Sequence, residues 1–254
     1  MKWFVQEGSI VREIWGKADT ILFIFAGASA EFALNKSVDW LYFTGKLPAD
    51  PLGRLFSTVS YARRIVFSEY DDAMRAIHQI AAIHAGVERS RHARIPDSAY
   101  RDVLFMLIDY SIRSYELLER TLTRAEKEEA FAVFQAVGEG MGIAGLPVSL
   151  REFERMRAEH LQENLHKSDF TVDLYRQYRK HLGWYRYFLL RQVQTRLVPE
   201  RVNALLGLGS AWLVDALLPF YKFAGMLGFG MFLRDALLPE NYKTQVTELD
   251  VVEQ

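Results

Sequence analysis

Cysteine is absent from this 254-residue chain, so histidine is the residue type best suited to bind a metal or to transfer protons. Without thiols the chain forms no disulfide, no thiolate zinc site, no Cys-ligated iron–sulfur cluster and no covalently attached c-type haem. A metal would be held by His, Asp, Glu, Tyr or Met, or by a cofactor macrocycle. A single Glu-x-x-His pair, Glu163 and His166, lacks the second copy that a di-iron bundle needs. We interpret this pair as a solvated helix end.

His84 is the histidine whose position best suits a ligand role. It falls within the apolar stripe of a helix expected over residues 70–87, whereas His78 points about 120° away and is expected in solvent. A lone histidine on an apolar face is usually a core residue hydrogen-bonded to a neighbour, and this interpretation stays open. Gly86 favours the ligand role, because it leaves room near the histidine for a planar ligand.

Three polar residues could complete a site around His84. Arg54 and Thr58 are four residues apart and share one face of a helix expected over residues 52–67. Arg54 could reach a carboxylate or propionate at the edge of a pocket, although a surface arginine is the simpler interpretation when it is taken alone. Asp109 is an acid in an apolar stretch. It could orient the His84 imidazole, pair with a buried arginine, or be a core carboxylate satisfied by its neighbours.

Helical periodicity extends over most of the chain and period-two alternation is scarce, which predicts an all-α fold. Asp50 and Pro51 predict an N-cap followed by proline at the first helical position. Glycine and proline between residues 138 and 147 predict a loop. We expect one domain over residues 1–240 and a polar tail over 241–254. Its helices are expected over 21–30, 52–67, 70–87, 98–118 and 171–197, after Thr123 and Ser149, and in two segments after Arg201.

The balance of residue types narrows the functional classes. Hydrophobic residues make up 50% and charged residues 25% of the chain, and the formal net charge is −1, so no overall field attracts nucleic acid. The N-terminus does not have the pattern of a signal peptide. The apolar segment 211–233 is interrupted by Asp215 and Lys222, and favours a buried or membrane-skimming helix pair. We therefore expect a cytoplasmic protein that could also associate peripherally with a membrane.

Several of these segments, taken in order, resemble the signature of one family. That family contains the latex-clearing (rubber) oxygenases and the fungal MpaB-type oxygenases. The resemblance covers roughly Trp15 to Leu208. It is carried by Asp50-Pro51-Leu52-Gly53-Arg54 with Thr58, Ile83-His84-Ala85-Gly86-Val87, Ile108-Asp109, Leu122-Thr123, Ala125-Glu126, Met141-Gly142-Ile143, Leu146-Pro147, Pro199, Arg201 and Leu206-Gly207-Leu208.

The resemblance implies a globin-related helical core that binds haem b without covalent attachment. His84 would be the proximal iron ligand, with Arg54 and Thr58 beside the haem pocket. It further implies an enzyme that uses dioxygen, bound at ferrous iron, to cleave or oxygenate the C=C bonds of a small hydrophobic substrate such as an isoprenoid or lipid.

The distal side of the pocket departs from the family pattern. Ser57 stands where latex-clearing members carry a lysine that occupies the distal iron site. The acidic residue thought to act as a base would be Asp39 or Glu31. Many relatives carry a His-Pro pair where this chain reads Ser29-Ala30-Glu31-Phe32. Two alternatives therefore stay open: a haem protein that binds or senses dioxygen without turnover, and a helical lipid-binding scaffold without haem.

Overall fold

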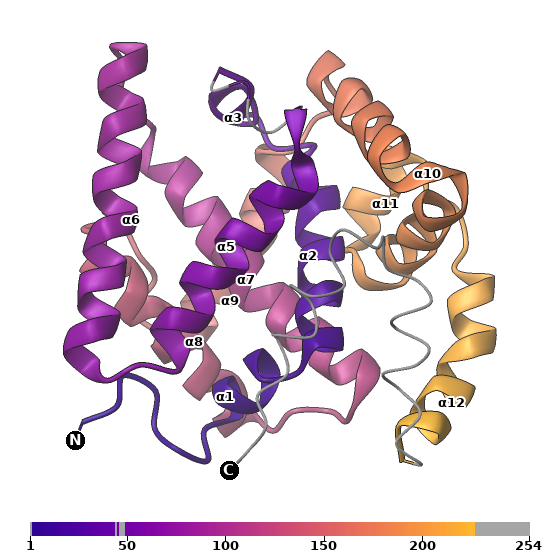
Figure 1. The fold of residues 1–254 in the computed structure, drawn as a ribbon, viewed down its shortest axis with the longest axis horizontal. Coiled ribbons are helices and arrows are strands. Elements are labelled where there is room, and N and C mark those ends of the chain that lie inside the picture. Colours follow the sequence, from indigo (N-terminus) through magenta and orange to yellow (C-terminus); the bar gives the residue numbers. More distant parts are fainter. Residues whose placement is uncertain (1, 44, 46–48, 227–254) are drawn as a thin grey trace.

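The computed structural model describes residues 2–43, 45 and 49–226. In these ranges the regular secondary structure is helical, which confirms the predicted all-α class (Figure 1). The helices are α1 (Ile10–Trp15), α2 (Ala18–Phe32), α3 (Asp39–Phe43), α5 (Pro51–Val66), α6 (Tyr70–Arg91), α7 (Asp97–Leu118), α8 (Arg124–Gly140), α9 (Leu150–Glu163), α10 (Asp169–Leu197), α11 (Glu200–Leu206) and α12 (Trp212–Met226).

Three helix starts lie where capping residues predict them. The Asp50 carboxylate accepts a hydrogen bond from the Gly53 backbone N–H at 2.8 Å, and Pro51 follows it as the first residue of α5. Thr123 opens α8 with a reciprocal capping box. The Ser149 hydroxyl accepts from the Glu152 N–H at 3.3 Å at the start of α9. These bonds satisfy backbone donors that a helix start otherwise leaves unpaired.

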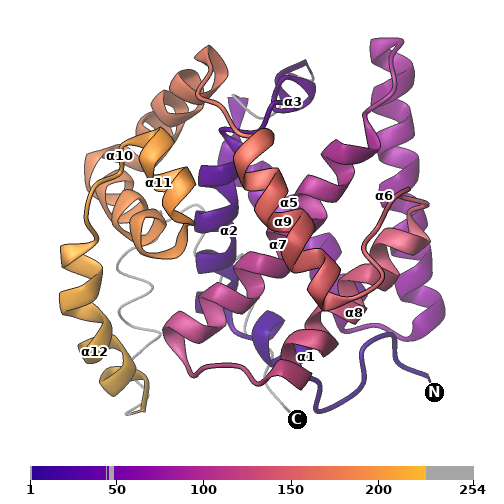
Figure 2. The ribbon, with the colours of Figure 1, turned by 180° about the vertical axis from the view of Figure 1, so that it is seen from behind.

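Helix α2 is central, with α5, α7, α9, α10 and α11 arranged around it (Figures 1 and 2). Its side chains Ile21, Ile24 and Ala30 are fully buried or nearly so. A Cβ atom on Gly27 would overlap the ring of Tyr110 in α7. Only glycine therefore lets α2 and α7 approach this closely. The uncharged run at residues 21–30 is a buried helix, as its length predicts.

The predicted loop over residues 138–147 is wrong at its start, because α8 continues to Gly140. A Cβ atom on Gly138 would lie 2.8 Å from a methyl of Leu104 and 2.9 Å from one of Leu146. Glycine at this position therefore serves close helix packing and does not end the helix. The loop begins at Met141. Gly142 there has a positive φ of 73°, a conformation that favours glycine.

Helix α10 confirms the helix predicted over residues 171–197, but it bends at Gly183, where φ is 73° and ψ is 172°. Helix α12 packs beside α10 (Figure 1). The predicted polar tail, 241–254, and the last part of the apolar segment, 227–233, lie outside the described residues. Among the helices described up to residue 226, none is both long enough and apolar enough to cross a membrane.

A buried ionic cluster joins α2, α7 and α9. The Glu31 carboxylate is completely buried and accepts two hydrogen bonds from the Arg157 guanidinium, one of them from Nη2 at 2.5 Å. It also accepts from the Tyr110 hydroxyl at 2.9 Å. Arg157 in turn donates to Asp109 from Nη2 at 2.9 Å, and Arg113 donates to Asp109 at 2.9 Å. One guanidinium thus bridges two carboxylates from different helices.

His160 extends this cluster from α9. Its Nε2 lies 3.1 Å from Glu31 Oε1, and its Nδ1 lies 2.8 Å from Asp102 Oδ1. Both ring nitrogens face carboxylates, the arrangement of a protonated imidazolium, which has two donors. The cluster is then neutral, with three carboxylates facing three cations: Glu31, Asp102 and Asp109, and Arg113, Arg157 and His160.

Removal of the central cation tests this cluster. We expect Arg157→Ala to lower the free energy of unfolding by about 3–5 kcal/mol, because it leaves Glu31 buried without its principal cation. Arg155→Ala is the matched control on the same helix, since Arg155 pairs with Glu159 on the surface and should contribute less than about 1 kcal/mol. Urea unfolding of both variants measures the difference. Equal small losses would contradict the role given to the cluster.

The pH dependence of stability tests His160. Burial by itself lowers the pKa of His160, but hydrogen bonds and charges from Asp102 and Glu31 outweigh it and raise the pKa above the ordinary 6.5. The fold thus favours the protonated ring. Its contribution to the free energy of unfolding is complete below pH 6.5 and is lost as the pH rises through the higher folded pKa.

Urea unfolding from about pH 6 to about pH 9 should show this loss in the wild-type chain and a flatter profile in His160→Gln. His78→Gln is the control, because His78 is exposed. A profile that is unchanged by His160→Gln would contradict the protonated state.

Candidate functional site

The second half of α6 presents His84 on a partly exposed apolar surface. The buried residues of this helix lie in its first half, and the last of them is Ile77. Beyond that point Ile83 is 46% exposed, and three neighbours on the helix are partly buried: Ile80, His84 and Val87. The apolar stripe predicted for residues 70–87 is therefore a core face in its first half and a partly accessible face in its second. His78 is exposed, as predicted.

Tyr100, in the first turn of α7, packs against the His84 ring. The two ring centroids are 5.2 Å apart, with an edge-on interplanar angle of 68°. The Tyr100 hydroxyl donates to Glu88 Oε1 at 3.3 Å, and Glu88 lies one turn beyond His84 on α6. Burial, together with the Glu88 charge, raises the pKa of Tyr100 to about 12. The hydroxyl therefore stays protonated near neutral pH, and the ring that restrains His84 is anchored to the same helix.

Arg54 and Thr58 lie on α5, at the end of the α5–α6 pair that carries His84. Only three residues, 67–69, separate the two helices, so they run in opposite directions. Both ribbon views show the pair diverging from this link (Figures 1 and 2). Arg54 is in the first turn of α5, and Thr58 follows one turn later with its side chain partly buried. The fold thus brings the three motif positions to the same end of one helix pair.

Asp39 reaches this end of the molecule through α3. Nη2 of Arg91, in the last turn of α6, donates to Asp39 Oδ2 at 2.6 Å. The Arg91 guanidinium also lies over the ring of Trp40, 4.0 Å from its centroid. Arg91 is two turns beyond His84 on the same helix. Asp39 is therefore placed near the second half of α6, with its charge balanced by an arginine.

Glu31, the other carboxylate considered as a base, belongs to the buried cluster. Burial by itself raises the pKa of Glu31, but the Arg157 guanidinium and His160 outweigh burial and lower it to about 2. Its described partners are Arg157, His160 and Tyr110. A carboxylate so strongly held in the ionised form is a poor proton acceptor. Of the two acids, Asp39 is the one placed beside α6.

Asp109 takes the second of the roles considered for it, because it pairs with a buried arginine. Its carboxylate accepts hydrogen bonds from Arg157 and Arg113. Gly86 lies two residues after His84, about 200° further around the helix. A Cβ atom there would meet nothing nearer than Nη2 of Arg89 at 3.8 Å. The space left by this glycine is therefore on the side of α6 away from the imidazole.

Tyr100 and Arg91 are the site residues that sequence reasoning missed. Tyr100 contacts His84 and Arg91 contacts Asp39, and each contact joins two different helices. A local sequence pattern does not predict such contacts. The buried partners Arg157 and His160 were missed for the same reason. A signal did exist for Arg157, since an acid in an apolar stretch, such as Asp109, favours a cation or several hydrogen bonds as partners.

The donor set around His84 fits a macrocycle better than a bare ion. Over residues 2–43, 45 and 49–226, no group of three or more His, Cys, Asp or Glu side chains could hold a metal ion. Haem b would need few protein donors, because the porphyrin supplies four nitrogens and a single histidine nitrogen could hold the iron. His84 is a single imidazole on a partly exposed apolar helix surface, a donor set compatible with that need.

The chain matches the family described as "ER-bound oxygenase mpaB/B'/Rubber oxygenase, catalytic domain" over residues 17–229, and so belongs to that family. The resemblance drawn from the motifs is thereby confirmed. No curated protein and no solved structure matches the chain. The family is that of an oxygenase catalytic domain, so membership supports oxygenase activity. The relation to globins stays a prediction.

Proposed function

We propose that this chain is a haem b-dependent oxygenase that uses dioxygen to cleave or oxygenate C=C bonds of an unsaturated hydrophobic substrate. The observation that carries the proposal is the setting of His84: a lone imidazole on the partly exposed half of α6 that packs against Tyr100, with Arg54 and Thr58 in the first half of α5, the helix linked to α6. Membership of an oxygenase family supports the same activity.

His84 would hold the haem iron through a ring nitrogen, and the contact with Tyr100 restricts rotation of that ring. Arg54 supplies a positive charge suited to a haem propionate. Thr58 supplies a hydroxyl that can donate or accept a hydrogen bond. When bound, haem supplies the redox chemistry with dioxygen that amino-acid side chains lack. Asp39, which is paired with Arg91 at this end of α6, would be the acid that holds or moves a proton.

The family name and the surface of the chain support the proposed substrate class. The family name includes rubber oxygenase, which indicates an apolar alkene such as an isoprenoid or an unsaturated lipid. Cleavage of one C=C bond by one dioxygen molecule gives two carbonyl groups, so both oxygen atoms enter the products and no further reductant is needed. Large apolar side chains are exposed and support contact with a membrane that could deliver such a substrate: Trp184, Trp212 and Phe220.

Haemin titration followed by absorption spectroscopy tests the anchor. We expect the wild-type chain to develop a Soret band, and His84→Ala to bind haemin at least about 100-fold more weakly. Changing a residue that only supports a metal ligand lowers affinity by about 10–100-fold. His78→Ala is the matched control, because it removes an exposed histidine from the same helix. Circular dichroism checks the fold of both variants. Equal haemin binding by the two variants would contradict His84 as the ligand.

Oxygen consumption tests the reaction. With haem and a polyene such as squalene, we expect dioxygen uptake together with aldehyde or ketone products, and loss of both in His84→Ala. An isotope experiment with labelled dioxygen should place one label in each carbonyl product of a cleavage. Haem binding without uptake or products would contradict turnover and favour the dioxygen-binding alternative.

A further inference from the structure

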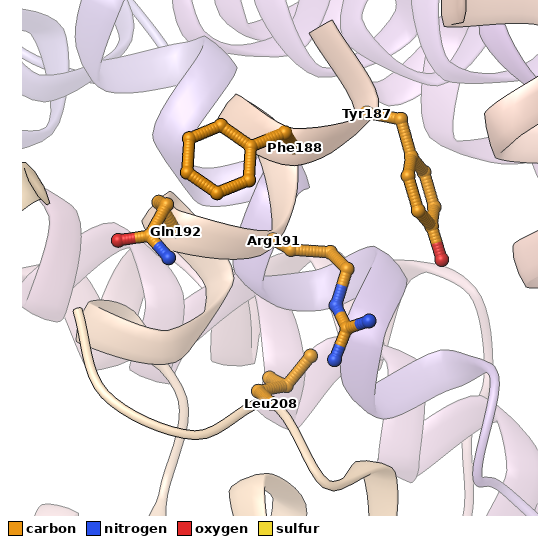
Figure 3. Close-up of a pocket in the computed structure, with 5 residues that line it drawn as sticks. All are labelled: Tyr187, Phe188, Arg191, Gln192 and Leu208. Atoms are coloured by element: carbon orange, nitrogen blue, oxygen red, sulfur yellow. The ribbon is translucent and has the colours of Figure 1, made fainter. Parts of the chain in front are cut away.

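A second candidate binding site lies in α10, on the opposite side of α2 from α6 (Figure 1). It is a pocket of about 290 Å³ lined by Tyr187, Phe188, Arg191, Gln192 and Leu208 (Figure 3). The first four form two pairs at four-residue spacing, Tyr187 with Arg191 and Phe188 with Gln192, and so share one face of the helix. Leu208, which follows α11, closes the pocket from the other side.

The walls of this pocket are mostly apolar, and the Arg191 guanidinium and the Gln192 amide supply hydrogen-bond donors. Two aromatic rings and the Leu208 side chain supply the apolar surface. The Gln192 carboxamide oxygen already accepts the Leu213 backbone N–H at 3.2 Å, which leaves the amide nitrogen to donate. Figure 3 shows that nitrogen on the side of Gln192 facing Arg191. The pocket therefore suits a ligand that has an apolar body and an accepting end.

Arg191 places a positive charge in the pocket, where it can meet the accepting end of a ligand. Its Nη2 donates to the Gly207 carbonyl at 2.9 Å, which holds the guanidinium over Leu208. Within the described part of the chain no carboxylate forms an ion pair with Arg191, whereas Arg196, on the same helix, pairs with Asp215 at 2.9 Å. The segment 184–197 carries arginines but no acidic residue. A partly buried guanidinium with an uncharged partner favours binding of an anion.

We propose that this pocket binds the carboxylate of a medium-chain fatty acid, with Arg191 on the carboxylate and the hydrocarbon chain against Tyr187, Phe188 and Leu208. Its volume is at the lower limit of ligand pockets, about 300–1,000 Å³, which favours a short chain over a long isoprenoid. The proposal does not depend on haem or on His84, because none of the lining residues belongs to α5 or α6.

Calorimetric titration of the full chain with decanoate and with decanol, both below their micellar concentrations, tests the proposal. We expect decanoate to bind at least about tenfold more tightly than decanol, because a charge-assisted hydrogen bond to arginine is lost with the alcohol. Arg191→Met keeps the apolar stem and removes the charge, so it should abolish this preference. Arg179→Ala is the matched control, because Arg179 is exposed on the same helix and outside the pocket.

The outcomes separate cleanly. Equal affinity for acid and alcohol, no binding of either, or a preference that survives Arg191→Met would overturn the proposal. If Arg191→Met does not fold, as judged by circular dichroism, Leu208→Trp provides the second test, since the larger side chain should fill the pocket and prevent decanoate binding. Decanoate binding that is unchanged by Leu208→Trp would also overturn it.

Discussion

The buried ion pair between Glu31 and Arg157 is the constraint on which the arrangement of the helices depends. A charge without its partner in a protein interior costs several kcal/mol, so α2 and α9 can pack only in the register that joins these two side chains. Arg157 also reaches Asp109, which ties α7 to the same point. Once α7 is placed by this cluster and by its close approach to Gly27, its first turn brings Tyr100 against His84. The candidate site is thus positioned from the core outwards.

Packing divides α6 into two parts with different properties. Its first half is buried beside α8, where a Cβ atom on Gly140 would lie 3.0 Å from Ile77, so that glycine permits the close contact. Its second half is held through side-chain contacts of His84 with Tyr100 and of Arg91 with Asp39, and its aliphatic residues stay partly accessible. The candidate site is therefore on the half of α6 whose aliphatic side chains are partly accessible. The pocket around Arg191 is built differently, from one helix face and a following loop.

Local signals predicted the helices well, because a helix start is decided by residues close in sequence. Asp50, Thr123 and Ser149 each satisfy backbone donors within the next turn, and each marks a true start. Gly138 was interpreted by the same local rules as part of a loop, and this was wrong. Glycine is needed there because a side chain would collide with Leu104 of another helix. For the site, the motif spacing proposed His84, Arg54 and Thr58, and the three positions lie away from the link between α5 and α6. The choice among three roles for Asp109 needed the position of Arg157, forty-eight residues away.

By itself, the sequence determined the all-α class, the starts of the three helices with clear caps, the family and the absence of any thiol chemistry, since each of these is written in composition, periodicity or ordered motifs. Only the tertiary structure decided that Glu31 is a structural carboxylate in the core, that Asp39 pairs with Arg91 beside α6, and that the apolar stripe of α6 is buried in one half and accessible in the other. The physical reason is that charge pairing and burial depend on distances between helices. A linear pattern records which side chains share a face, and it contains no measure of what lies opposite that face.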